Sequence, residues 1–204
     1  MINNKILTAK EQSKLTPDKV IEILKRGNKA FTDDILTLKS RFVKEQHPAA
    51  IILSCIDSRV PVKDIFQCAT GDIFVARVAG NIVNSDILGS MEYACKVSGA
   101  KLIVVMGHRN CGAVKSAIDN MELGNITGLL NKIKPAVTQS KTDFKGETKS
   151  SNPEFVETVC LANVSLVVNE IRKNSPVLKA MEDKGEIKIA GAMYDIESGK
   201  VDFF

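Results

Sequence analysis

Two short segments contain side chains whose types and spacing could hold a metal ion. Cys55 follows the apolar run 49–53, and His108 and Cys111, three positions apart, follow the apolar run 102–106. Two thiolates and an imidazole suit zinc, which takes sulfur and nitrogen ligands in tetrahedral geometry. Three protein ligands leave the fourth position for water, as in catalytic rather than structural sites. The sequence therefore predicts one catalytic Zn²⁺ per chain, held by these three residues.

Asp57 and Arg59 add a second feature to the first segment. A carboxylate two residues from a ligand can accept a hydrogen bond from zinc-bound hydroxide, while the guanidinium keeps it ionised and aimed. Alone, the two residues would be a surface ion pair worth about 0–1 kcal/mol. Alone, Cys55 would more often be a packed core cysteine, and His108 a hydrogen-bonded loop histidine as often as a ligand. Their joint placement after two apolar runs favours a catalytic site.

The pattern around these segments predicts the elements that position them. Apolar residues recur at helical spacing from Ile87 to Cys95, before Gly99, and again after Pro153, so that strands and helices alternate. This alternation predicts an α/β fold with a mainly parallel central sheet flanked by helices, in which ligands bind beyond the carboxyl ends of the strands. The apolar runs do not alternate with polar residues, as expected for strands covered on both faces. The predicted strands are 49–53, 73–76, 102–106 and 187–190.

Other local signals are weaker. Thr16 and Pro17 predict the start of an amphipathic helix that ends at Gly27, and a second helical pattern covers 35–42. The polar segment 140–151 reads as an exposed loop.

Composition excludes several classes of protein. The 204 residues are 44% hydrophobic and 25% charged, typical of a globular domain, and no apolar run reaches about 18 residues. Neither a secretory signal nor a nucleotide-binding glycine loop is present, so we expect a cytoplasmic protein without membrane contact. The net charge of +4 comes without a basic run, which argues against nucleic-acid binding. The odd count of five cysteines argues against a disulfide framework, and we assign no chemistry to Cys68, Cys95 and Cys160.

The two motifs, Cys-x-Asp-Ser-Arg and His-x-x-Cys-Gly, closely resemble those of the beta carbonic anhydrases. The similarity extends over 71–81 and 90–94, and more loosely over 191–195. It implies a zinc-dependent lyase (carbonate dehydratase) that reversibly hydrates carbon dioxide to bicarbonate and a proton. It also implies a homodimer or a dimer of dimers (a homotetramer). In that assembly residues 1–45 form an N-terminal helical arm on the partner subunit, and 46–204 form a single α/β catalytic domain.

Residue by residue, the resemblance makes Cys55, His108 and Cys111 the zinc ligands and Asp57 and Arg59 the catalytic pair. The substrate-binding positions that it implies are Gln46, Phe74, Ala79, Tyr93 and Gly112, the last through its backbone N–H.

The sequence departs from the family at two positions. Ile52 stands where one subgroup has a tryptophan of an inhibitory bicarbonate site. We therefore expect no regulation through such a site, and we expect an open metal site. Val78 replaces a common asparagine, and any role of that side chain is lost.

Three other functions fit parts of the pattern. A hydrolase of carbon disulfide or carbonyl sulfide would use the same ligands. A scaffold held by structural zinc would be expected to carry a fourth protein ligand, and thiol redox chemistry a nearby resolving cysteine. A proton acceptor is also undetermined, since the only histidine besides His108 is His47.

Overall fold

The structure is a computed structural model that describes residues 8–35 and 46–204. It divides into two compact units, 1–45 and 46–204. In the first, the described residues form the helices α1 (Ala9–Gln12) and α2 (Pro17–Ile35). Thr16 caps α2, since its Oγ1 accepts a hydrogen bond from the N–H of Lys19 at 3.3 Å. The predicted end at Gly27 is wrong, because one glycine inside a helix costs only about 1 kcal/mol and the residues after it continue the helix. The helix predicted over 35–42 falls almost wholly outside the described residues.

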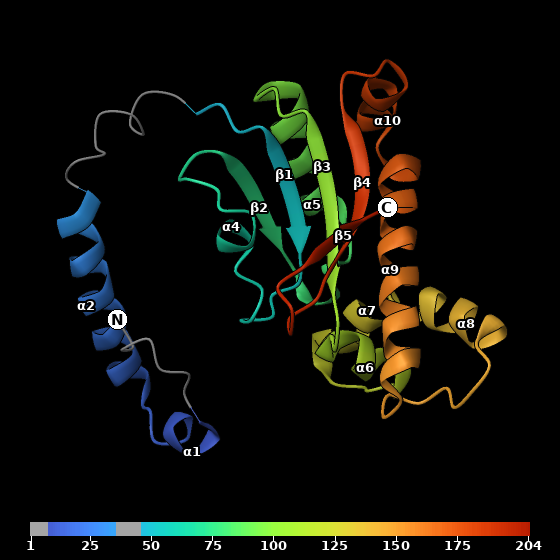
Figure 1. Ribbon diagram of the computed structural model, residues 1–204, viewed down its shortest axis with the longest axis horizontal. Helices are drawn as coiled ribbons and strands as arrows, with labels where there is room; N and C mark the ends of the chain where they lie inside the picture. The colour runs from blue at the N-terminus through green and yellow to red at the C-terminus, as the bar shows by residue number, and fades with distance from the viewer. Residues whose placement is uncertain (1–7, 36–45) are drawn as a thin grey trace. The chain divides into compact units, whose positions relative to one another are not determined.

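The second unit contains one sheet of five strands in the order β2-β1-β3-β4-β5 (Figure 1). The first four strands along the chain are parallel to one another, and β5 is antiparallel to β4. The predicted α/β fold with a mainly parallel sheet and its four strands is thus confirmed, with β5 as an addition. The strands are β1 (Ala50–Ser54), β2 (Ile73–Arg77), β3 (Leu102–His108), β4 (Lys188–Tyr194) and β5 (Val201–Phe203).

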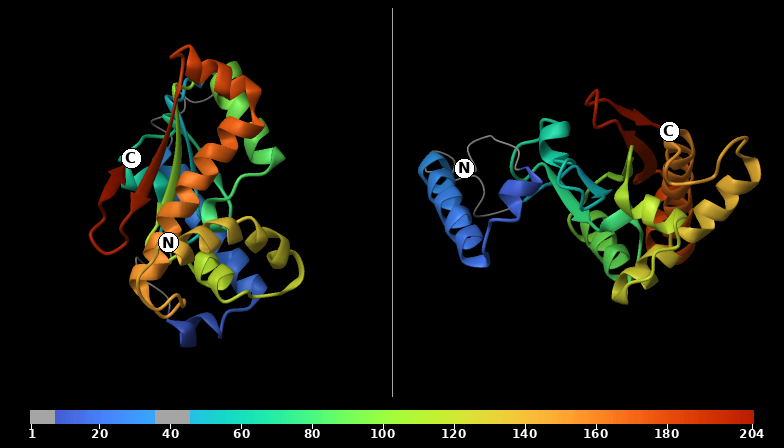
Figure 2. Two further views of the ribbon diagram at one scale, coloured as in Figure 1. Left: turned by 90° about the vertical axis from the view of Figure 1, so that its right-hand side faces the viewer. Right: turned by 90° about the horizontal axis from the view of Figure 1, so that it is seen from below.

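Different elements cover the two faces of the sheet. On one face Leu53, Val105 and Ile189 pack against α5, α9 and α10, and Figure 2 shows α9 and α10 along that face. On the other face Ile52 and Val104 pack against α4 and the segment around β5. The helices are α4 (Val62–Ile65), α5 (Ser85–Glu92) with the π-turn η2 (Tyr93–Val97), α9 (Pro153–Asn174) and α10 (Pro176–Asp183).

A third group of elements lies at the carboxyl end of the parallel strands. The 3₁₀ turn η1 (Ala79–Asn81) follows β2, and the helices α6 (Gly112–Ile118), α7 (Gly124–Asn131) and α8 (Lys134–Asp143) follow β3. In Figure 1, α6 and α7 lie beyond the arrowheads of β1 and β2. The predicted loop 140–151 is partly wrong, because its first four residues complete the last turn of α8. These helices thus pack at the sheet edge where the segments after β1 and β3 begin.

The expectation that all four strands are covered on both faces is wrong for β2. It is an edge strand, and Val75 is 39% exposed. Its apolar run resembles that of a buried strand because sequence alone does not reveal which strand lies at the edge. Among residues 8–35 and 46–204, no helix is both long and apolar enough to cross a bilayer.

Gly107, in β3 next to His108, allows α9 to approach the sheet closely. A Cβ placed there would lie 2.6 Å from Cγ2 of Val164 and 3.2 Å from Sδ of Met193. We predict that Gly107→Ala lowers the free energy of unfolding by about 1–3 kcal/mol through overpacking. Gly128→Ala is the matched control, because a Cβ there meets nothing within 4 Å, and should stabilise α7 by about 0.5–1 kcal/mol. Urea denaturation measures both, and equal effects would contradict this packing.

Candidate metal centre

The three predicted ligands meet at the carboxyl edge of the sheet. Cys55 directly follows β1, His108 ends β3, and Cys111 immediately precedes α6. Their donor atoms all lie within 4.8 Å of one another. The sulfur atoms of Cys55 and Cys111 are 3.9 Å apart, and two thiolates bound tetrahedrally to one zinc ion would be about 3.8 Å apart. The separation of the two sulfur atoms therefore fits coordination to one Zn²⁺ ion.

His108 presents the correct nitrogen to the metal. Its Nδ1 lies 2.8 Å from the carbonyl oxygen of Arg109, and because a carbonyl only accepts, Nδ1 must carry the proton. Nε2 is then the unprotonated nitrogen, and it is buried without a hydrogen-bond partner among the described residues. A buried nitrogen lone pair without a partner is costly unless something binds it. A cation held by this nitrogen and the two sulfurs would supply that partner.

The two thiols are too close to ionise together without a cation. Interaction with Cys111 lowers the pKa of Cys55 to about 4 despite its burial. The same interaction, together with burial, raises the pKa of Cys111 far above its ordinary value. The pair thus carries one negative charge readily, and a divalent cation would allow two. All five cysteines lie in the described part of the chain and none forms a disulfide.

Asp57 and Arg59 form a bidentate ion pair beside the metal ligands. Nε and Nη2 of Arg59 donate to the two carboxylate oxygens at 2.9 and 2.7 Å. This pairing lowers the pKa of Asp57 to about 2. The carboxylate therefore contributes stability above its ordinary pKa, near 4, and loses it as the pH falls through about 2. Asp57 Oδ2 also lies 3.8 Å from Nε2 of His108, so the carboxylate faces the metal position.

Arg77, at the end of β2, holds the backbone of the ligand loop. Its Nε donates to the carbonyl of Cys55 at 2.9 Å, and its Nη2 donates to the carbonyl of Asp57 at 2.6 Å. Our sequence analysis gave Arg77 no role. Its position could have indicated a role, because Arg77 is a charged residue directly after the predicted strand 73–76. The carboxyl ends of the strands form the sheet edge where the site was expected.

The predicted substrate residues fall into two groups. Ala79 and Gly112 adjoin the metal ligands, since Ala79 precedes Gly80, whose N–H donates to the sulfur of Cys55 at 3.4 Å, and Gly112 follows Cys111. A Cβ added at Gly112 would meet nothing within 4 Å.

Phe74 and Tyr93 instead line a separate cavity of about 680 Å³ between β2 and α5, whose lining includes none of the metal ligands. Gln46 is exposed at the start of the second unit.

An α/β domain with an open cysteine–histidine–cysteine site at the carboxyl edge of its sheet defines a zinc metalloenzyme. Residues 50–201 match the family model of carbonic anhydrase. Carbonic anhydrase 2 of Mycobacterium tuberculosis is 30% identical over 190 residues, which cover 87% of each chain. The beta-carbonic anhydrase of Coccomyxa, solved with acetazolamide, superposes with a TM-score of 0.76 at 25% identity, covering 88% of this chain and 83% of that one.

A tetrameric beta-carbonic anhydrase of Sordaria macrospora shares the fold, with a TM-score of 0.72 at 24% identity, covering 91% of this chain and 93% of that one.

The chain belongs to the carbonic anhydrase family, in its beta class. The predictions of a lyase and of zinc as its cofactor are confirmed by this membership and by the cluster of the three ligand side chains.

Loss of a ligand should abolish metal binding. We predict that Cys55→Ser and His108→Ala each reduce bound zinc from one ion per chain to near zero, because two ligands hold zinc weakly. Cys68→Ser is the control, since Cys68 is a cysteine outside the cluster. Metal content of protein purified without chelators measures the effect. Stoichiometric zinc in both ligand variants would contradict the assignment.

Proposed function

We propose that the chain reversibly hydrates carbon dioxide to bicarbonate and a proton, with the reacting atoms placed between Asp57 and the three metal ligands. Cys55, His108 and Cys111 would hold the zinc ion, which would act as a Lewis acid and make water a nucleophile near neutral pH, an effect whose reference case is itself a carbonic anhydrase. The unpaired lone pair of His108 Nε2 beside two sulfurs carries this proposal.

In this proposal Asp57 is the residue that orients the nucleophile. As a carboxylate held by Arg59 it has no proton to donate, so it accepts a hydrogen bond only from an oxygen that carries one. An oxygen without a proton would instead meet its negative charge. Asp57 therefore favours a hydroxyl group at this position. When that group donates its hydrogen to Asp57, the lone pairs of its oxygen are directed at the substrate.

Replacing the carboxylate with an amide tests this role. We predict that Asp57→Asn keeps one zinc per chain and loses turnover by about 10- to 100-fold, because the amide NH₂ can donate where only an acceptor fits. Stopped-flow measurement of carbon dioxide hydration with a pH indicator reports the rate, and metal analysis reports the zinc. Asp64→Asn, at an exposed carboxylate of α4, is the control.

Two results would change the proposal. Full hydration activity in Asp57→Asn would remove the orienting role from Asp57. Stoichiometric zinc in wild-type protein without hydration, but with release of sulfide from carbon disulfide or carbonyl sulfide, would favour the alternative hydrolase.

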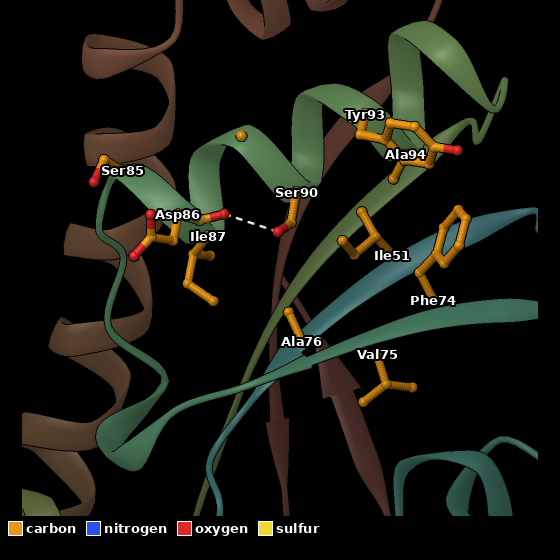
Figure 3. A pocket seen from close by; sticks show the side chains of 11 residues that line it. Ile51, Phe74, Val75, Ala76, Ser85, Asp86, Ile87, Ser90, Tyr93 and Ala94 are labelled. Carbon is orange, nitrogen blue, oxygen red and sulfur yellow. Dashed lines mark hydrogen bonds between the residues drawn. The ribbon is translucent and has the colours of Figure 1, made fainter.

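The second part of the proposal is a homodimer, or a dimer of dimers, in which a second copy covers the outer side of β2 and α5. Apolar side chains are exposed there, including Val75 at 39% and Tyr93 at 53%. They border the cavity that Figure 3 shows, with Phe74 and Ile51 on its strand side and Tyr93 and Ala94 on its helix side. An open edge strand beside exposed apolar groups favours a partner that pairs with it.

The same assembly would give Phe74 and Tyr93 their predicted role. Phe74 lies three residues before the end of β2, roughly 10 Å from the carboxyl edge of its own sheet, and so does not reach substrate there. In a symmetric dimer it would serve the site of the other copy. The helix α2 also exposes apolar groups, Ile21, Leu24 and Phe31, which supports the proposed packing of the 1–45 arm on a partner subunit. A cytoplasmic location stays a prediction.

A charge at the exposed edge tests the proposed interface. We predict that Val75→Asp shifts the protein toward monomer in sedimentation velocity, because the edge cannot bury an unpaired carboxylate. Leu161→Asp is the matched control, since Leu161 is 38% exposed on α9, a helix that packs on α8, α10, β3 and β4. An unchanged oligomer in the Val75 variant would place the interface elsewhere.

A further inference from the structure

Asn163 is a polar residue on the apolar inner face of α9, all of which lies in the described part of the chain. It is 1% exposed. Its Nδ2 donates to the carbonyl oxygen of Gly80 at 2.9 Å, across 83 positions of sequence. Its Oδ1 is buried with no hydrogen-bond partner among the described residues. The other buried residues of α9 are Phe155, Val156, Val159, Cys160, Val164, Val167, Val168 and Ile171.

Such a residue needs an explanation. A buried amide that satisfies only one of its two polar atoms contributes little to folding, since the unpaired oxygen loses its hydration without compensation. An apolar side chain of the same size would fit the surrounding core at no such cost. The presence of Asn163 is therefore better explained by its hydrogen bond to Gly80 than by a contribution to the free energy of unfolding.

What it holds is Gly80, a residue whose own N–H contacts the metal centre. The N–H of Gly80 donates to the sulfur of Cys55 at 3.4 Å. Gly80 adopts φ +66°, a conformation that favours glycine, and a Cβ there would lie 2.5 Å from Cδ1 of the buried Ile133. Gly80 is thus held at its carbonyl by Asn163 and at its Cα by packing.

We propose that Asn163 is a positioning residue for the metal centre, which keeps the Gly80 N–H directed at the Cys55 sulfur. The inference rests on the proposed zinc site at Cys55. A hydrogen bond from a backbone N–H stabilises charge on a ligand sulfur and restricts its orientation. Without Asn163, the Gly80 carbonyl loses its buried donor and the turn over 79–81 is held less firmly. The Gly80 N–H, which belongs to the preceding peptide unit, then loses its fixed direction toward the sulfur.

The experiment compares Asn163→Leu, which fills the same volume without a donor, with Asn163→Ser, whose shorter side chain fits the core but does not reach Gly80. Zinc affinity is measured by competition with a chelating dye, and the sulfur-to-metal charge-transfer band is recorded on Co²⁺-substituted protein. Both variants should bind zinc about 10- to 100-fold more weakly and show an altered band.

Ser140→Ala is the control, because Ser140 is also buried with an unpartnered side-chain oxygen but belongs to α8. It should match wild type in both measurements.

The outcomes separate this inference from the proposed function. If wild type binds one zinc and either folded Asn163 variant matches it in affinity and in the Co²⁺ spectrum, the positioning role is wrong. A lower melting temperature with unchanged metal binding would likewise assign Asn163 to the fold alone. Wild-type protein that bound no zinc would overturn the metal centre itself, and this inference with it.

Discussion

The closeness of two buried sulfur atoms is the constraint on which the rest of the site depends. At 3.9 Å apart, Cys55 and Cys111 cannot both be thiolates in a buried setting unless a cation lies between them. The surrounding groups are arranged for that charge. The imidazole of His108 is held with its lone pair facing the sulfurs, a backbone N–H faces one sulfur, and the guanidinium of Arg59 balances Asp57.

The parallel sheet makes this convergence possible. β1 and β3 are neighbours, so the residues after their carboxyl ends start from adjacent positions at one edge. Packing then brings the loops together, since α9 approaches β3 closely at Gly107 and carries Asn163 to the Gly80 turn. Arg77 reaches the loop after β1 from the end of β2. Three neighbouring strands and one helix thus hold a site whose ligands come from only two segments.

One chain does not bring all the predicted substrate residues to its own metal. Ala79 and Gly112 adjoin the ligands, whereas Phe74 and Tyr93 line a cavity between β2 and α5. Carbon dioxide is apolar, so a binding region for it needs apolar walls beside the polar metal ligands. A second copy on the β2 edge would supply such walls and would also cover the exposed apolar side chains of that edge.

The sequence by itself determined the chemistry of the site and the class of fold. Cys55, Asp57 and Arg59 lie within one stretch of five residues, and His108 and Cys111 lie within one stretch of four. Side-chain types and these short spacings were therefore enough to predict a zinc site with an ion pair beside it. The strands were predicted from apolar runs, although the edge position of β2, the strand β5 and the length of α2 were not. The tertiary structure alone decided the tautomer of His108, the clamp of Arg77 and the contact of Asn163 with Gly80. These depend on packing between segments 22 to 83 positions apart or on one buried hydrogen bond, and neither leaves a periodic pattern in the sequence.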